Sequence, residues 1–224
     1  MTVLYEDNHL IIINKSGSEI VQSDKTGDVS LEDSLKQWIK EKYHKPGNVF
    51  LGVAHRLDRP VSGVVVFART SKALARLNEM FRNGEVHKTY LAIVKEVPRQ
   101  PEATLEQYLV RNEQQNKSYV YDHMRPGAKK AILHYRLVGR SDRYCLLEID
   151  LKTGRHHQIR CQLAAMGCPI KGDLKYGFPR SNPGGGISLH ARKISFIHPV
   201  SKELIEVTAP FPEDEPLWKC FQNE

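Results

Sequence analysis

The chain has 224 residues, with 33 Lys or Arg against 26 Asp or Glu, which leaves a formal net charge of +7 at pH 7. Its length allows one sizeable core or two small domains, and 40% hydrophobic with 26% charged residues is ordinary for a soluble globular protein. The basic surplus favours a polyanionic partner, because neutralised phosphates release condensed counterions, although charge alone does not establish one.

The cysteines indicate neither a zinc site nor a disulfide framework, because no two of them form a C-x-x-C pair. They read as reduced thiols and are Cys145, Cys161, Cys168 and Cys220. The N-terminal segment is acidic early and its apolar run is short, which fits a β-strand rather than a signal peptide or a membrane span. We therefore expect a cytoplasmic protein that does not contact a membrane.

The first predicted elements are a strand and a helix. Residues 9–17, HLIIINKSG, read as a strand that ends in a turn containing glycine. Ser30 is placed to cap a helix. The apolar residues of this helix follow helical spacing and are Leu31, Leu35, Trp38 and Ile39.

Residues 63–68, GVVVFA, read as a second strand, and a second helix follows it. Ser71 is the candidate N-cap of the helix, and Asn83-Gly84 is its predicted end. The inward stripe of this helix is predicted to consist of Leu74, Leu77 and Phe81. Residues 88–95, KTYLAIVK, then return as a strand.

Residues 98–130 are polar and weakly periodic, and their second part, QQNKSYVYDHMRPGAKK, reads as an exposed basic excursion. Two strands, AILHYRLV and YCLLEIDLK, come next. Residues 155–167, RHHQIRCQLAAMG, predict a helix with Ile159, Leu163 and Met166 on one stripe. ISLHARKISFIHP and ELIEVTAP are predicted closing strands.

Strands and helices do not alternate strictly, which favours an α+β fold over a parallel doubly wound one. We expect a mixed, largely antiparallel central sheet with flanking helices. No internal repeat or low-complexity linker interrupts the chain, so residues 1–224 are expected to form a single domain.

The loop HRLDRPVSG places Asp58 directly before an apolar strand that would fix its position. Its flanking arginines, Arg56 and Arg59, favour the ionised carboxylate. From these residues alone, a solvated aspartate in a turn is favoured over a catalytic carboxylate.

The stretch TGRHHQIR predicts His156 and Arg160 one turn apart on the same face of a helix. A guanidinium at the edge of the core can hold a carboxylate bidentately, whereas a solvated basic face is the alternative. Metal binding by His156 and His157 is disfavoured, because adjacent helical residues point apart.

On the strand KTYLAIV, the ring of Tyr90 is placed to stack on a base, with Lys88 on the same side by the two-residue alternation. Core packing is the commoner role of a tyrosine on a strand.

Taken together, these stretches resemble the pseudouridine synthases of the RluA type. The resemblance rests on HRLDRPVSG, KTYLAIV, TGRHHQIR with CPIKGDLKYG, and SLHARKISFIHP, in that order, and covers nearly the whole chain. It implies a mixed, largely antiparallel sheet flanked by helices, and neither a metal nor an organic cofactor. The implied reaction turns a uridine within an RNA chain into pseudouridine.

The resemblance also implies roles for single residues. Asp58 is the catalytic aspartate, Arg160 pairs with it, and Tyr90 stacks on the target base. Leu189 walls the pocket, and Arg56 enters the RNA stack where the uridine leaves it. The residues further expected to bind the substrate are His55, Lys88 and Arg155.

Three residues depart from the family's usual pattern. Ser16 replaces proline in the N-K-P-x-G turn, Val61 replaces threonine before Ser62-Gly63, and His156 replaces threonine or serine inside GR-x-HQIR. None of them is a proposed catalytic group, but Val61 and His156 are placed to alter RNA contacts.

The chain is therefore expected to be a monomeric RNA isomerase without a separate N-terminal RNA-binding domain. Its substrate is expected to be ribosomal or transfer RNA, with large-subunit ribosomal RNA favoured. One alternative is a catalytically inactive RNA-binding protein of the same fold. Another is a glycoside-type hydrolase using Asp58, which would need a second carboxylate as general acid. The nearest candidate is Asp173, which reads as structural.

Overall fold

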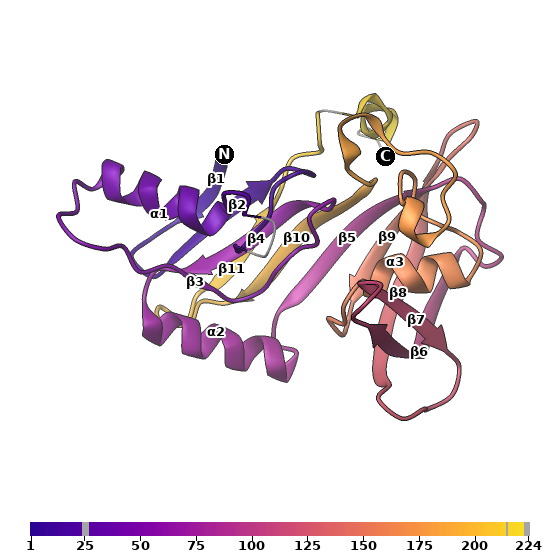
Figure 1. The fold of residues 1–224 in the computed structure, drawn as a ribbon, viewed down its shortest axis with the longest axis horizontal. Coiled ribbons are helices and arrows are strands. Elements are labelled where there is room, and N and C mark those ends of the chain that lie inside the picture. Colours follow the sequence, from indigo (N-terminus) through magenta and orange to yellow (C-terminus); the bar gives the residue numbers. More distant parts are fainter. Residues whose placement is uncertain (24–26, 214, 222–224) are drawn as a thin grey trace. The chain divides into compact units, whose positions relative to one another are not determined.

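The computed structural model of the chain describes residues 1–23, 27–213 and 215–221 (Figure 1). By its internal contacts the chain divides into two compact units. The first unit consists of Met1–Val86 and Lys193–Pro210, and the second of His87–Arg192 and Phe211–Glu224. Among the described residues, no helix is both long and apolar enough to cross a membrane.

The first unit is a sheet with one helix on each side (Figure 1). The helices are α1 (Leu31–Lys42) and α2 (Ser71–Asn83). The strands are β1 (Thr2–Glu6), β2 (Leu10–Lys15), β3 (Gly52–Val53), β4 (Ser62–Ala68), β11 (Leu204–Thr208) and the later part of β10 (Leu189–Ile197). Antiparallel pairs join β1 to β2, β2 to β4, β3 to β4 and β10 to β11.

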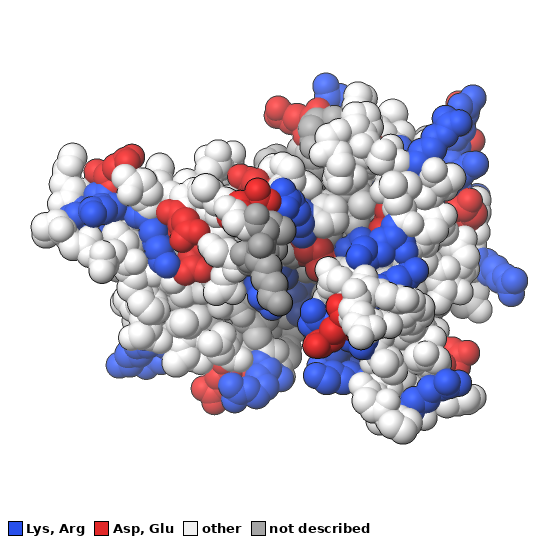
Figure 2. All heavy atoms as spheres, in the orientation of Figure 1, with Lys and Arg blue, Asp and Glu red and all other residues white. Residues whose placement is uncertain are grey.

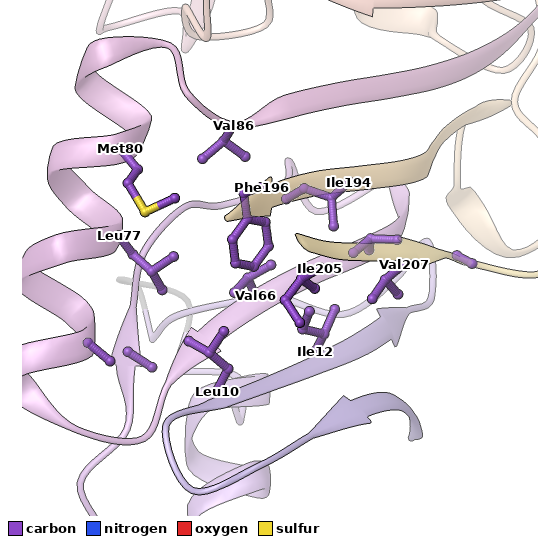
Figure 3. Packing of buried hydrophobic residues seen from close by; sticks show 14 residues of the cluster. Leu10, Ile12, Val66, Leu77, Met80, Val86, Ile194, Phe196, Ile205 and Val207 are labelled. Carbon is purple, nitrogen blue, oxygen red and sulfur yellow. The ribbon is translucent and has the colours of Figure 1, made fainter. Parts of the chain in front are cut away.

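Burial on both faces explains the apolar runs that predict β2 and β4. Every residue of β4 is buried, and a strand covered on both faces carries a continuous rather than an alternating apolar sequence. One face packs against α2, where Leu10, Val66 and Leu77 meet side chains of β10 and β11 (Figure 3). The sheet immediately after the Asp58 loop is thus rigid.

The helix caps agree with the sequence at α1 and differ at α2. Ser30 caps α1, as predicted, because its side chain accepts a hydrogen bond from the amide of Asp33. At α2 the cap is Thr70 rather than Ser71, with Thr70 Oγ1 accepting from Ala73 N at 3.2 Å. Thr70 has the extended backbone that a cap requires, and Ser71 is already helical. Gly84 ends α2 in the left-handed conformation, as predicted.

The inward stripe of α2 is shifted from the predicted one. Its buried residues are Ala73, Leu77 and Met80, whereas Leu74 and Phe81 lie partly buried at its margins. Only Leu77 of the predicted stripe lies at its centre.

The second unit is an antiparallel sheet that carries short helices. Its strands are β5 (His87–Val94), β6 (Glu102–Asn112), β7 (Lys117–Tyr121), β8 (Lys129–Arg140), β9 (Cys145–Leu151) and the first part of β10. The strand order runs β5-β9-β8-β6-β7. The helices are α3 (Gln158–Ala165) and the 3-10 turns η1 (Leu174–Tyr176), η2 (Pro183–Gly185) and η3 (Pro216–Phe221).

The polar segment 98–130 contains strands β6 and β7, which were not predicted, while most of the part predicted to be an exposed excursion is exposed. Strand β6 pairs with β8 on one side and with β7 on the other. Its burial alternates between exposed and partly buried residues, and Leu109 with Val120 of β7 packs near α3. Neighbouring strands, rather than an apolar sequence, provide the order.

Helix α3 begins three residues later than predicted, at Gln158 rather than Arg155. His157 precedes it in the left-handed conformation, with φ of 53°. His156 therefore lies before the helix, and the prediction that it shares a helical face with Arg160 was wrong. The helix is also buried around most of its circumference, so its apolar stripe is not its only buried face.

The fold is confirmed as α+β, with a mixed and mostly antiparallel sheet and few helices. The described cysteines are free, and three of them are buried.

The two candidate caps of α2 can be separated by mutation. We expect Thr70→Ala to lower the free energy of unfolding by about 1 kcal/mol, because the amide of Ala73 loses its acceptor. Ser71→Ala, one residue on, is the matched control and should change it by less than about 0.5 kcal/mol. Urea unfolding measures both, and a larger loss for Ser71→Ala would contradict the assignment.

Candidate active site

Asp58 lies in the loop between β3 and β4 of the first unit. Leu57 is buried beneath the loop, Asp58 is half-buried and Arg56 is exposed. The amide of Val61 donates to the carbonyl oxygen of Asp58 at 3.0 Å, which closes a turn directly before β4. The loop therefore presents a carboxylate and an exposed arginine on a backbone fixed at both sides.

A buried lysine holds this backbone in place. Lys15, at the end of β2, is only 1% exposed. Its Nζ donates to the carbonyl oxygens of Ser16 and Arg59 at 2.8 Å and of Val61 at 2.6 Å. An ammonium group has three hydrogens, so these three acceptors match its donors. Two of them belong to the residues that follow Asp58 in the loop.

Burial lowers the pKa of Lys15 from its ordinary value of 10.5 to about 7, and the negative charges of Glu19 and Asp58 act against this fall. Lys15 was not among the site residues predicted from the sequence. A lysine at the end of an apolar strand normally extends into solvent, and only the position of the later loop shows that its ammonium group is enclosed.

The other polar residues of the loop are also held. His55 Nε2 accepts a hydrogen bond from the amide of Val66 at 3.1 Å, and its ring centre lies 4.9 Å from that of Phe81 in α2. Arg59 donates to Asp28 at 2.7 Å. His55 thus connects the loop to β4 and α2, while the ion pair of Arg59 lies at an exposed position.

In the second unit, Tyr90 and Lys88 lie two residues apart on β5, as predicted. Tyr90 is 8% exposed. Burial lowers the pKa of Lys88, an effect that the nearby Asp150 opposes. A Cβ atom placed on Gly154 would lie 3.9 Å from Lys88 Nζ, so the lysine reaches the start of the TGRHHQIR stretch.

Arg160 is held by a buried carboxylate. Its Nε donates to Asp173 Oδ2 at 2.7 Å and its Nη2 to Oδ1 at 2.9 Å, in the two-bond geometry typical of arginine and carboxylate. The two side chains are 6% and 1% exposed. The guanidinium carbon also lies 5.2 Å from the ring centre of Tyr176. Its orientation is therefore fixed within the second unit.

The contacts of Asp173 support the structural role that the sequence suggested for this residue. Both of its oxygens accept hydrogen bonds from Arg160, an arrangement that suits an anchor rather than the general acid of a glycoside hydrolase. That Arg160 is its partner could not be read from the sequence, because burial and proximity depend on how η1 folds back on α3.

Leu189 and Arg155 complete the predicted residues of the second unit. Leu189 is buried at the start of β10, next to Ser188, whose carbonyl accepts from the amide of Ile93 in β5. Arg155 is exposed, and its Nε donates to the carbonyl of Lys130 at 2.9 Å. Within the described ranges, no cluster of three or more His, Cys, Asp or Glu residues could hold a metal ion.

The family model for RNA pseudouridylate synthase matches residues 9–165, a stretch that includes Asp58, Tyr90 and Arg160. The chain belongs to this family and is an RNA pseudouridine synthase, as the sequence resemblance implied.

Two curated relatives and one solved structure show the extent of the similarity. "Ribosomal large subunit pseudouridine synthase D" of Xanthomonas campestris pv. campestris is 34% identical over 96% of this chain and 67% of its own length. "tRNA pseudouridine synthase C" of Vibrio cholerae is 30% identical over 100% of this chain and 95% of its own. "Human RNA Pseudouridylate Synthase Domain Containing 4" shares the fold, with a TM-score of 0.79 at 24% identity over 95% of this chain and 89% of that one.

We expect Lys15→Met to lower the free energy of unfolding by about 2–4 kcal/mol near neutral pH, because three carbonyl oxygens lose their donor. The exposed Lys40 of α1 provides the control, and Lys40→Met should change it by less than about 0.5 kcal/mol. Urea unfolding of the three proteins makes the comparison.

The native chain and Lys15→Met also test the lowered pKa of Lys15. Between pH 7 and 10.5 the unfolded chain retains a proton that folded Lys15 has released. Stability rises with pH where the unfolded state binds more protons. Below pH 7 the folded chain carries the full free-energy cost of burying the charged ammonium group, and this cost decreases as the pH rises from 7 to 10.5. The stability of the native chain should therefore rise relative to Lys15→Met, and parallel pH profiles would show that Lys15 is not titrating there.

We expect Arg160→Met to lose about 3–5 kcal/mol of stability, because Asp173 is left as an uncompensated buried charge. The double variant Arg160→Met/Asp173→Leu should recover most of this loss and still form no pseudouridine. Arg136→Met, at the exposed pair with Glu148, is the control and should cost less than about 1 kcal/mol. A stable and active double variant would remove Arg160 from the catalytic groups.

Proposed function

We propose that the chain converts specific uridines of structured RNA into pseudouridine with Asp58 as the nucleophile. Large-subunit ribosomal RNA is the favoured substrate and transfer RNA the alternative, in keeping with the names of the two relatives described above. The observation that carries the role of Asp58 is its half-buried carboxylate on a loop whose backbone is bound by the Lys15 ammonium group.

The reaction is an isomerisation that needs no other reactant. The bond between the sugar carbon and N1 of uracil breaks, and a new bond joins the same sugar carbon to C5. The hydrogen of C5 leaves as a proton, and N1 takes up a proton, so atoms and charge balance. Asp58 supplies the negative charge that stabilises or attacks the electron-poor fragment released in the first step.

Arg160 is proposed to pair with Asp58 and so keep its carboxylate ionised in a site that excludes water. The bonds from Asp173 hold one edge of the guanidinium group. Preorganising a charged group in this way avoids reorganisation during the reaction. Tyr90 is proposed to stack on the uracil and Leu189 to close the pocket, which prevents the detached base from escaping.

The remaining residues are proposed to bind and open the RNA. Arg56 is exposed beside Asp58 and is proposed to fill the gap left by the flipped uridine. Lys88 and Arg155 supply positive charge for phosphates. For His55, the hydrogen bond from Val66 supports a role in positioning the loop.

The test is release of tritium from RNA labelled at C5 of uracil, since isomerisation replaces that hydrogen. We expect the native chain to release tritium and Asp58→Asn to release it at least about 1,000-fold more slowly, while RNA binding persists. Asp142→Asn carries the same change at an exposed turn and should behave as the native chain does.

Comparable rates for Asp58→Asn and the native chain would show that the nucleophile is assigned wrongly. If the native chain released no tritium from ribosomal or transfer RNA, the inactive RNA-binding alternative would be favoured instead. The class of RNA that yields tritium identifies the substrate.

A further inference from the structure

The turn between β6 and β7 is bound to the loop that precedes α3. The two ring nitrogens of His156 lie 3.1 Å from Asn116 Oδ1 and 2.9 Å from Ser118 Oγ. Ser118 Oγ also donates to the carbonyl of His156 at 2.7 Å. His156 is one of the residues that depart from the family's usual pattern, and here it joins the hairpin to the body of the second unit.

A second set of hydrogen bonds joins the hairpin to Tyr176 and His157. The amide of Ser118 donates to the hydroxyl of Tyr176 at 2.8 Å, and that hydroxyl lies 2.9 Å from His157 Nδ1. The rings of His156 and His157 stack with centres 3.7 Å apart, contrary to the expectation that they point apart. The left-handed backbone of His157 makes this stacking possible. The hairpin end, the loop and η1 therefore form one rigid surface.

This surface carries cationic side chains. Lys175 of η1 is exposed, and its Nζ donates to the carbonyls of Gln115 and Asn116 at 3.3 and 3.1 Å. Lys117 Nζ lies 5.2 Å from the ring centre of Tyr176. Arg111 of β6 is exposed and pairs with Ser118, so it lies on the other face of the hairpin from Lys117 and Tyr119.

Several cations act on the buried ring of His157. Burial lowers the pKa of His157 to about 2, and the further contributions of Arg160, His156, Lys175 and Arg111 all act in the same direction. On the hairpin itself, Glu113 is the acidic residue of the turn, and Asp122, at the far end, accepts from Gln107. In the face drawn in Figure 2, Lys and Arg side chains lie over the region of α3.

An aromatic side chain lies among these charges. Tyr119 of β7 is 39% exposed, and Lys117 Nζ lies 5.6 Å from its ring centre. Strand β7 ends the strand order of the second unit, so its outer edge has no neighbouring strand there. Alternating cations and exposed aromatic rings are typical of surfaces that follow a nucleic-acid backbone and stack on its bases.

We propose that Lys117, Tyr119, Lys175 and the loop at His156 form a docking surface for the RNA phosphate backbone. This surface belongs to the second unit and contains no residue of the Asp58 loop. The cations bind phosphates, and Tyr119 stacks on an unpaired base. The proposal rests on the proposed function in taking RNA as the partner, and it assigns the docking to the β6–β7 hairpin.

The salt dependence of RNA binding tests this docking surface. The probe is a fluorescein-labelled RNA stem-loop whose loop is rich in uridine, and it is titrated with the full chain at several KCl concentrations. The logarithm of the association constant K falls linearly with the logarithm of the salt concentration, and each phosphate contact adds about one to the magnitude of this slope. Lys117→Gln and Lys175→Gln should each reduce the magnitude of this negative slope by about one, and the double variant should reduce it by about two. Lys117→Arg and Lys175→Arg should keep the native slope, because the charge remains.

Tyr119→Ala should weaken binding by at least about 5-fold without changing the slope, because stacking releases no counterions. The control is Lys72→Gln, at an exposed position on α2 of the first unit, and it should leave the slope and the affinity unchanged.

An unchanged slope in the Lys117→Gln/Lys175→Gln variant overturns the proposal, even if affinity falls, because the lysines would then act only on the fold. An equal change in Lys72→Gln also overturns it, since the charge effect would not be local. Binding is measured without turnover. Failure of the tritium assay would therefore refute the proposed reaction, whereas the salt-dependence measurement would still decide whether the hairpin docks RNA.

Discussion

One ammonium group, that of Lys15, fixes the backbone on which the candidate nucleophile lies. A buried cation must find acceptors, and Lys15 finds them in the carbonyls of Ser16, Arg59 and Val61. The loop can therefore adopt this path only while β2 and β4 are paired. In the second unit, Asp173 holds Arg160 in a comparable way. In both units a buried charge is matched by bonds within its own unit, and the proposed reactive groups rest on that support.

Much of the fold follows from local sequence. The apolar runs of β2 and β4, the Ser30 cap and the Gly84 end of α2 were all predicted, because each depends on neighbouring residues alone. The family followed from motifs whose order and spacing are specific, and the family model covers those that lie within residues 9–165. The positions of Tyr90 and Lys88 on one strand needed only the two-residue alternation.

The remaining features depend on partners distant in sequence. Strands β6 and β7 are polar, and their order comes from pairing of β6 with β8 and of β7 with β6. The late start of α3 depends on the left-handed His157, a conformation uncommon outside glycine. Lys15 was missed because lysines are rarely buried, and two of its three acceptors are supplied by a loop more than forty residues later in the chain. Conformation and burial at these positions are properties of the folded chain.

The central claim is that Asp58 and Arg160 act on the same uracil. A crystal structure of the chain with bound RNA measures this most directly. The account predicts the Asp58 carboxylate and the Arg160 guanidinium at about 2.7–2.9 Å, the distance of a charge-assisted hydrogen bond, beside a uridine flipped out of the RNA. Well-ordered side chains facing different parts of the bound RNA, with no contact between them, would contradict it.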